Sequence, residues 1–233
     1  MRLCVIPARG GSKRIPRKNI KIFCGQVMID YSIKAALDSQ CFDQVIVSTD
    51  DAEIAEVAKS FGASVPFVRP DELANDYTGT ISVIKHAIEW FDDQNQSPSE
   101  VCCLYATAPF IQADVIREAY KQMKQRQADY CFTVTSFAFP IQRAIKITAD
   151  NRIEMLHPEY LETRSQDLEE AYHDAGQFYW GTAESFKQKK PLFSKSATPY
   201  ILTRHLVQDI DTLEDWKRAE LMYQVLKKSG ELD

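Results

Sequence analysis

Hydrophobic residues alternate along the chain between short continuous runs and stretches with helical spacing. Continuous apolar runs are typical of buried strands, and apolar residues repeated at three and four positions are typical of amphipathic helices. The runs predict strands over residues 3–6, 45–50, 64–67, 101–105 and 130–137. The repeats predict helices over residues 28–37, 51–61, 80–91, 114–126 and 212–228. We therefore expect an α/β fold with a mostly parallel sheet, helices on both faces and ligands beyond the carboxyl ends of the strands.

Polar residues at the starts of three predicted helices indicate N-terminal caps. Asp50 or Asp51 precedes the second helix, and Asp114 opens the fourth. Thr212 stands three residues before Asp215, which is the spacing of a capping box. Side-chain oxygens at these positions accept hydrogen bonds from backbone N–H groups that the first helical turn leaves free.

The alternation of strands and helices stops after residue 137. Two short strand-like pieces follow, around 143–147 and 152–156, and then a polar run over 158–171. The strand pattern returns at 176–180. We therefore expect one domain over residues 1–233 with a small insertion at 138–171, since a chain of this length lies at the upper end of the range for a single core.

Composition narrows the class of protein. The formal net charge of -5 argues against a general nucleic-acid binder. No apolar run approaches the roughly 20 residues of a membrane span, so we expect a cytoplasmic protein without a membrane partner. The six cysteines lack a C-x-x-C pair, and we expect them to be reduced, buried side chains that bind no metal.

A glycine pair and a group of cations follow the first predicted strand. Gly10 and Gly11 are expected to adopt positive φ and to bring backbone N–H groups close to an anion. Four cationic side chains of this loop are expected to serve the oxygens of a triphosphate: Arg9, Lys13, Arg17 and Lys18. A solvated basic turn is the alternative, but so many cations in a chain of net negative charge favour a phosphate cradle.

Two familiar phosphate motifs do not occur in this loop. The P-loop spacing Gly-x-x-x-x-Gly-Lys-Ser/Thr is missing, and so is the dinucleotide motif Gly-x-Gly-x-x-Gly. A nicotinamide-dependent enzyme is therefore disfavoured. None of the four histidines has the spacing of a hydrolytic triad or of a His-x-x-x-His metal motif.

Two aspartates near the last helix are candidates for a metal site. Asp209 and Asp211 follow the strand-like Leu206 and Val207, and the side-chain period of a strand places both carboxylates on one face. Mg²⁺ takes one or two carboxylates together with phosphate oxygens, which suits a site next to a phosphate cradle. The alternative is that Asp211 only caps the helix and Asp209 is solvated. Asp50 and Asp51 are the poorer pair, because consecutive strand residues point to opposite faces.

The chain resembles a known family over three motifs. Residues 8–13 read Ala-Arg-Gly-Gly-Ser-Lys, and Ile15-Pro16 and Lys18-Asn19-Ile20 follow. Residues 69–76 are similar to the motif Arg-Pro-x-Glu-Leu-x-x-Asp. These motifs resemble the cytidylyltransferases that activate nonulosonic acids, a family that includes CMP-sialic acid synthetases and pseudaminic acid cytidylyltransferases. The resemblance implies a Rossmann-like nucleotidyltransferase fold, and a homodimer that associates through the insertion at 138–171.

The resemblance also implies a nucleotide site and a metal site. Its residues for CTP are Ala8, Arg9, Gly10, Gly11, Ser12, Lys18, Asn19, Arg69, Thr78 and Thr80. Arg69 is expected beside the cytosine, where its guanidinium suits a pyrimidine carbonyl, although a surface salt bridge is the commoner role of an arginine. The family's magnesium aspartates match Asp209 and Asp211, and Mg²⁺ is the implied cofactor.

The sugar end of the site is expected to differ from that of sialic acid synthetases. Tyr105 stands where those enzymes have a glutamine, whereas Thr107 and Pro109 are retained. Residues 172–180 read Tyr-His-Asp-Ala-Gly-Gln-Phe-Tyr-Trp, as in pseudaminic acid cytidylyltransferases. Arg164 matches a family arginine that meets the sugar carboxylate. The implied sugar-acid residues are Tyr105, Thr107, Arg164, His173 and Gln177.

The sequence thus predicts transfer of CMP from CTP to the anomeric hydroxyl of a nonulosonic acid, with pseudaminic acid as the expected substrate. Its expected catalytic residues are Arg9, Lys18, Asp209 and Asp211, because such a transfer depends on positioning and charge neutralisation. The same chemistry on sialic or legionaminic acid is the nearest alternative. A non-catalytic nucleotide-sensing module is less favoured, because it would need no Asp-x-Asp pair.

Overall fold

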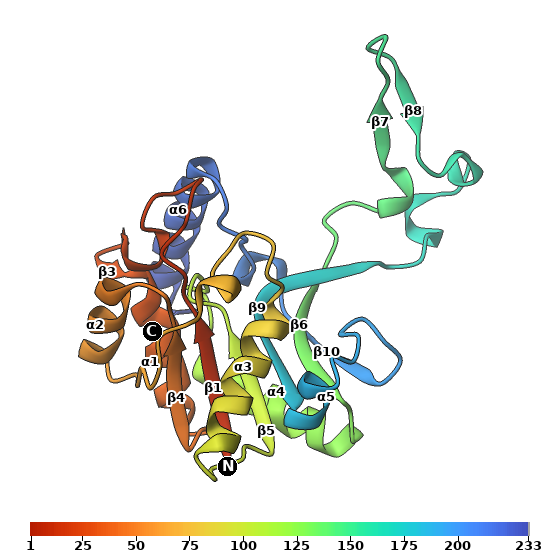
Figure 1. The fold of residues 1–233 in the computed structure, drawn as a ribbon. Helices are drawn as coiled ribbons and strands as arrows, with labels where there is room; N and C mark the ends of the chain where they lie inside the picture. The colour runs from red at the N-terminus through yellow and green to blue at the C-terminus, as the bar shows by residue number, and fades with distance from the viewer. Residues whose placement is uncertain (233) are drawn as a thin grey trace.

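The protein is organised around a six-stranded sheet, seen in a computed structural model that describes residues 1–232 (Figure 1). The strand order is β10-β6-β9-β5-β1-β4. The strands are β1 (Arg2–Pro7), β4 (Gln44–Ser48), β5 (Glu100–Leu104), β6 (Tyr130–Ser136), β9 (Tyr172–Thr182) and β10 (Ala197–Ile201). β9 runs antiparallel to both of its neighbours, β5 and β6, and the remaining neighbouring pairs are parallel. The expected α/β fold with a mostly parallel sheet is confirmed.

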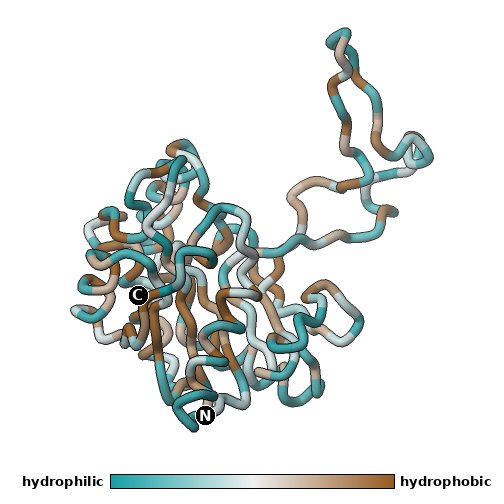
Figure 2. Tube along the Cα trace, in the orientation of Figure 1, coloured by the Kyte–Doolittle hydropathy of each residue, from teal (hydrophilic) through white to brown (hydrophobic). Residues whose placement is uncertain are grey.

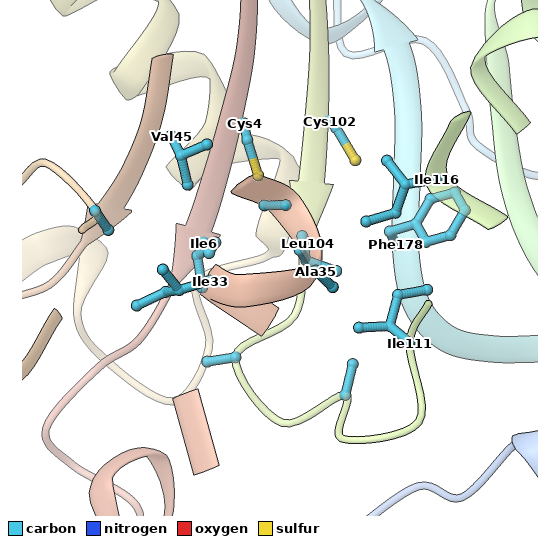
Figure 3. Packing of buried hydrophobic residues seen from close by; sticks show 14 of the residues in the cluster. Cys4, Ile6, Ile33, Ala35, Val45, Cys102, Leu104, Ile111, Ile116 and Phe178 are labelled. Carbon is cyan, nitrogen blue, oxygen red and sulfur yellow. The ribbon is translucent and has the colours of Figure 1, made fainter. Parts of the chain in front are cut away.

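Six helices accompany the sheet. They are α1 (Met28–Ser39), α2 (Ala52–Ser60), α3 (Thr80–Asp93), α4 (Ala113–Arg126), α5 (Ala183–Lys187) and α6 (Leu213–Ser229) within residues 1–232. Alternate residues of β1 enter different cores: Cys4 and Ile6 pack with α1, α2 and α4, whereas Leu3 and Val5 pack with α3 and α5. Figure 3 shows Ile6 beside Ile33 of α1, and Ile116 of α4 beside Phe178 of β9. Both faces of the sheet are therefore covered, which explains the continuous apolar runs in the sequence.

A third apolar cluster fixes the last helix. Trp216, Tyr223 and Leu226 of α6 pack with Phe23 and with Ile15 of the basic loop. Phe23 lies in the small hairpin formed by β2 (Ile22–Phe23) and β3 (Gln26–Val27). The cluster holds the two ends of the chain together, so the basic loop and the aspartates before α6 become neighbours.

Two expected elements differ in the structure. Residues 64–67 form no regular strand: Ser64 makes an isolated parallel bridge with Ile46, and Pro66 has no N–H with which to continue a ladder. Gln112, not Asp114, occupies the N-cap position of α4, and Asp114 lies in the first turn. The other two caps are confirmed, since Asp51 accepts a hydrogen bond from Ile54 N, and Thr212 forms the capping box with Asp215.

The cysteines lie mostly in the core, as expected. Cys4, Cys41, Cys102, Cys103 and Cys131 are buried, whereas Cys24 is only half-buried in the hairpin turn. All six are free thiols. Burial raises the pKa of the Cys4 and Cys102 thiols, which keeps them in the unreactive protonated form. Within residues 1–232, no helix is both long and apolar enough to cross a membrane.

Residues 137–171, which connect β6 to β9, form an arm that projects from the sheet (Figure 1). It carries the antiparallel hairpin of β7 (Ile145–Ile147) and β8 (Ile153–Met155), close to the strand-like pieces expected there. Figure 2 shows hydrophobic segments along this arm as well as in the sheet. Apolar side chains that are exposed on the arm include Phe139, Ile145, Ile147, Ile153, Leu156 and Leu161.

Candidate active site

The basic loop, residues 8–18, follows β1 and lies against the start of α2. Its two glycines have different surroundings. Neither Gly10 nor Gly11 has positive φ, so that expectation was wrong. Gly10 is required for a close approach instead, because a Cβ at this position would lie 2.7 Å from Asp51 Oδ2. Gly10 N donates to Asp50 Oδ1 at 3.0 Å. A Cβ on Gly11 would meet only Arg9 Nη1, at 3.9 Å.

Each cation of the basic loop has a carboxylate partner. Arg9 and Lys13 pair with Asp76, and Arg17 pairs with Asp51 and Glu53. Arg14 Nη2 lies 2.8 Å from Asp211 Oδ2, and Lys18 Nζ lies 3.4 Å from Asp211 Oδ1. The hydrogen bond from Arg17 holds the pKa of Asp51 at about 2. Arg17 thus anchors the loop to α2.

The nucleotide residues expected near the base meet around a pocket of about 210 Å³. Arg9, Arg69, Thr78, Thr80 and Tyr105 are among its lining residues. Arg69 is only 3% exposed, and its Nε donates to Ser48 Oγ at 3.1 Å at the end of β4. Burial lowers the pKa of Arg69 to about 10. The alternative of a surface salt bridge is therefore wrong for this arginine.

Three other expected nucleotide residues support the loop without lining this pocket. Ala8 is buried in the core, and Ser12 is half-buried. Asn19 is buried, and its Nδ2 donates to Arg9 O at 3.0 Å. The contacts of Asn19 indicate that it shapes the backbone that presents Arg9.

A second pocket, of about 590 Å³, adjoins the first through Tyr105, which lines both. Two residues expected in the sugar site line it, Tyr105 and His173, together with Asp209. It also contains three charged residues that sequence analysis missed: Asp174, Arg204 and Arg218.

The remaining expected sugar residues lie elsewhere. Thr107 is half-buried and does not line this pocket, and Gln177 is buried with its Nε2 donating to Leu206 O at 2.7 Å. Arg164 lies on the arm, where its side chain is exposed and its Nε pairs with Asp167 at 2.7 Å. The chain therefore does not bring Arg164 to the pocket that contains Tyr105 and His173, because the arm carries it away from the sheet (Figure 1).

Contacting side chains around Tyr105 line the two pockets. Tyr105 Oη lies 3.1 Å from Thr80 Oγ1, and the rings of Tyr105 and Tyr179 pack edge to face. The Tyr179 hydroxyl donates to Asp174, whose other oxygen accepts from Gly176 N at 2.9 Å. Burial raises the pKa of both tyrosines, so they remain neutral hydrogen-bonding groups.

Asp209 and Asp211 lie between the second pocket and the basic loop. They are not on a strand, because residues 207–211 are irregular after a 3₁₀ turn at Arg204–Leu206. The same-face argument from strand periodicity was therefore wrong. Burial raises the pKa of Asp209, and the negative charge of Asp211 raises it further.

These two carboxylates satisfy one requirement of a Mg²⁺ site. A divalent cation stabilises two neighbouring carboxylates, and Mg²⁺ completes its shell with water and phosphate oxygens. Among residues 1–232, no group of three or more His, Cys, Asp or Glu side chains is arranged to hold a metal by itself. The donor set therefore fits a metal that arrives with phosphate oxygens better than a closed structural site.

Comparison with known proteins identifies the family. The model of the cytidylyltransferase family matches residues 3–227. The chain belongs to the cytidylyltransferase family. The resemblance seen in the three sequence motifs is thereby confirmed. The protein is an enzyme of the cytidylyltransferase class.

Relatives of similar length carry related names. A pseudaminic acid cytidylyltransferase from Campylobacter jejuni subsp. jejuni serotype O:2 is 47% identical over 228 residues, which cover 98% of each chain. A CMP-N,N'-diacetyllegionaminic acid synthase from Legionella pneumophila is 32% identical and covers 96% of each chain.

The fold also recurs in a solved structure of CMP:2-keto-3-deoxy-manno-octonic acid synthetase complexed with CTP, with a TM-score of 0.71. That structure covers 97% of this chain and 99% of its own, at 16% identity, so this likeness concerns the fold alone.

Proposed function

We propose that this cytidylyltransferase transfers CMP from CTP to the anomeric hydroxyl of pseudaminic acid, with pyrophosphate as the leaving group. The observation that carries this proposal is the pair of adjoining pockets that share Tyr105, with Asp209 lining the second pocket. The smaller pocket suits the nucleoside and the larger one suits a nine-carbon sugar acid. The name of the 47% identical relative supports the choice of sugar.

In this proposal the basic loop binds the triphosphate. Arg9, Lys13 and Lys18 are assigned to the phosphate oxygens, with Gly10, Gly11 and Ser12 beside them. Asp76 pairs with Arg9 and Lys13, so nucleotide binding exchanges the carboxylate for phosphate oxygens at these two cations. The remaining CTP residues assigned here are Ala8, Asn19, Arg69, Thr78 and Thr80.

Asp209 and Asp211 are assigned to Mg²⁺, which would neutralise charge on the phosphates when bound. The chain's own residues then act by position: Lys18 lies next to Asp211, and Ile210 O accepts from its Nζ at 2.6 Å. This contact supports assigning Lys18 to the negative charge that develops as pyrophosphate leaves. Catalysis would thus rest on alignment and on charge neutralisation by Arg9, Lys18 and the two aspartates.

We also propose that the enzyme is a cytoplasmic homodimer in which the arm contacts a second copy. The support is the arm's exposed apolar surface, which is unusual for a segment that extends from the main body. Tyr105, Thr107, His173 and Gln177 remain assigned to the sugar acid or its immediate support. Arg164 could meet a sugar only through an arrangement of two copies.

The test is release of pyrophosphate from CTP with pseudaminic, legionaminic and N-acetylneuraminic acids in parallel. Aromatic and apolar groups near Tyr105 favour a deoxy sugar with N-acyl groups, so kcat/KM for pseudaminic acid is expected to exceed that for N-acetylneuraminic acid at least about a hundredfold. ATP and GTP in place of CTP serve as nucleotide controls, and both are expected to react poorly. Equal use of the three sugars would contradict the proposed substrate, and no reaction with any of them would contradict the activity.

A further inference from the structure

Two arginines in the larger pocket differ from the other cations around the site. Arg204 lies in the 3₁₀ turn before Asp209, and Arg218 lies in the second turn of α6. Both line the pocket with Tyr105 and Asp209. Across residues 1–232, neither guanidinium forms an ion pair or donates a side-chain hydrogen bond, whereas each cation of the basic loop is paired with a carboxylate.

Asp215 lies three residues before Arg218 on α6, and its carboxylate is already engaged. It accepts from Thr212 N and from Thr212 Oγ1, each at 2.8 Å, and from Asp211 N at 3.2 Å. The Thr212 hydroxyl is also the main cause of the lowered pKa of Asp215, to which Arg218 contributes last. Arg218 therefore keeps its hydrogen-bonding capacity for a group in the pocket.

The chemistry of the sugar acid requires a cation at this place. In a nonulosonic acid the carboxylate carbon is bonded directly to the anomeric carbon, so the carboxylate lies next to the hydroxyl that attacks the phosphorus. A residue that binds this carboxylate must consequently stand close to the metal and phosphate end of the pocket. Arg204 and Arg218 meet this condition because they flank Asp209 and Asp211 in the chain and share a pocket with Asp209.

We infer that Arg204 and Arg218 bind the carboxylate of the sugar acid and so restrict the enzyme to acidic sugars. This inference rests on the proposed function and deepens it by adding two arginines of the pocket itself to the carboxylate role that the resemblance gives to Arg164. The planar guanidinium suits a carboxylate because two parallel N–H donors match its two oxygens. Holding the carboxylate also fixes the rotation of the anomeric carbon, which orients the attacking hydroxyl.

The experiment compares the sugar acid with its carboxamide, which has the same shape without the charge. The variants are Arg204→Gln, Arg218→Gln and the double variant, with Arg117→Gln as a control at a half-buried arginine outside this pocket. Loss of a hydrogen bond to a charged group is expected to lower kcat/KM for the acid about ten- to a hundredfold in each single variant. The KM for CTP and the unfolding temperature are expected to stay unchanged.

The decisive quantity is the ratio of kcat/KM for the acid to that for the carboxamide. The wild type and Arg117→Gln are expected to prefer the acid strongly, and the double variant is expected to lose this preference. The inference is overturned if the double variant keeps its preference for the acid over the carboxamide. It is also overturned if Arg164→Gln loses this preference while the double variant keeps it. Pyrophosphate release by the wild type with the acid tests the proposed function. The ratios in the variants test only which residues bind the carboxylate, so the two proposals can fail separately.

Discussion

Gly10 and Gly11 are adjacent in the sequence, yet their surroundings predict opposite tolerance to a methyl group. Gly10→Ala would force its Cβ against the Asp51 carboxylate, at 2.7 Å from Oδ2 and 3.0 Å from Cβ. Overpacking of this kind costs about 1–3 kcal/mol, so we expect the variant to unfold at lower urea concentration. Gly11→Ala is the matched control, because its Cβ would meet only the flexible end of Arg9 at 3.9 Å. Equal unfolding midpoints for the two variants would contradict this explanation of Gly10.

Asp211 connects the metal proposal with two cations of the basic loop. Asp211→Asn keeps the size of the side chain but removes the charge that pairs with Arg14 and Lys18. Loss of charge stabilisation in the transition state is expected to lower kcat by about a hundredfold or more, with little change in the far-UV spectrum. Glu214→Gln, an exposed acid in the first turn of α6, is the control and should retain full turnover. Undiminished turnover of the wild type in EDTA, or of Asp211→Asn with CTP, would exclude the assigned metal role.

At the scale of elements, the start of α2 depends on one carboxylate. Asp51 caps the helix through Ile54 N at 3.0 Å and also binds Arg17, so it joins α2 to the basic loop. Asp51→Ala is expected to destabilise the protein by about 1–2 kcal/mol at neutral pH, as measured by urea unfolding. Glu53→Ala serves as the control, because Glu53 is exposed and makes no cap.

The effect of Asp51 should also depend on pH. Its folded pKa is about 2, below the value of about 3.9 for an unperturbed aspartate. A lowered folded pKa means that the ionised form stabilises the native state above about pH 4 and that this contribution disappears as the pH falls from 4 towards 2. The difference in unfolding free energy between wild type and Asp51→Ala should therefore shrink over that interval. A difference that stays constant down to pH 2 would show that the ion pair does not stabilise the fold.

At the scale of the molecule, the arm determines assembly in our proposal. Ile145, Ile147, Ile153 and Met155 lie on one face of its hairpin, because paired and alternate residues of antiparallel strands share a face. Lys146 and Glu154 form an ion pair on the other face, at 3.1 Å. The hairpin is therefore amphipathic, although the arm extends away from the core.

Ile147→Asp is expected to convert the proposed dimer into monomers, as measured by sedimentation velocity, because a buried unpaired charge opposes association. Phe193→Asp is the matched control: Phe193 is 71% exposed, close to the 73% of Ile147, but it lies outside the arm. A dimer that survives Ile147→Asp but not Phe193→Asp would place the interface elsewhere.

Much of the fold could be predicted from local patterns. β1, β4 and β5 were recognised because strands buried on both faces need continuous apolar runs, and α6 was recognised from the box of Thr212 and Asp215. β10 was missed, because Pro199 and exposed residues interrupt its pattern and the strand forms only through its pairing with β6. The antiparallel direction of β9 was also not predicted, since direction depends on the path of the arm and not on the residues of the strand.

The sequence by itself determined the class of fold and the cationic character of the basic loop, because residue types and short spacings are local properties. It also contained the motifs that identify the family. Only the tertiary structure decided which carboxylates hold Arg9 and Arg17, why residue 10 is glycine, and that Arg204 and Arg218 share a pocket with Tyr105. These features depend on distances between segments far apart in the chain. Such distances follow from how the helices pack on the sheet, which no single stretch of sequence encodes.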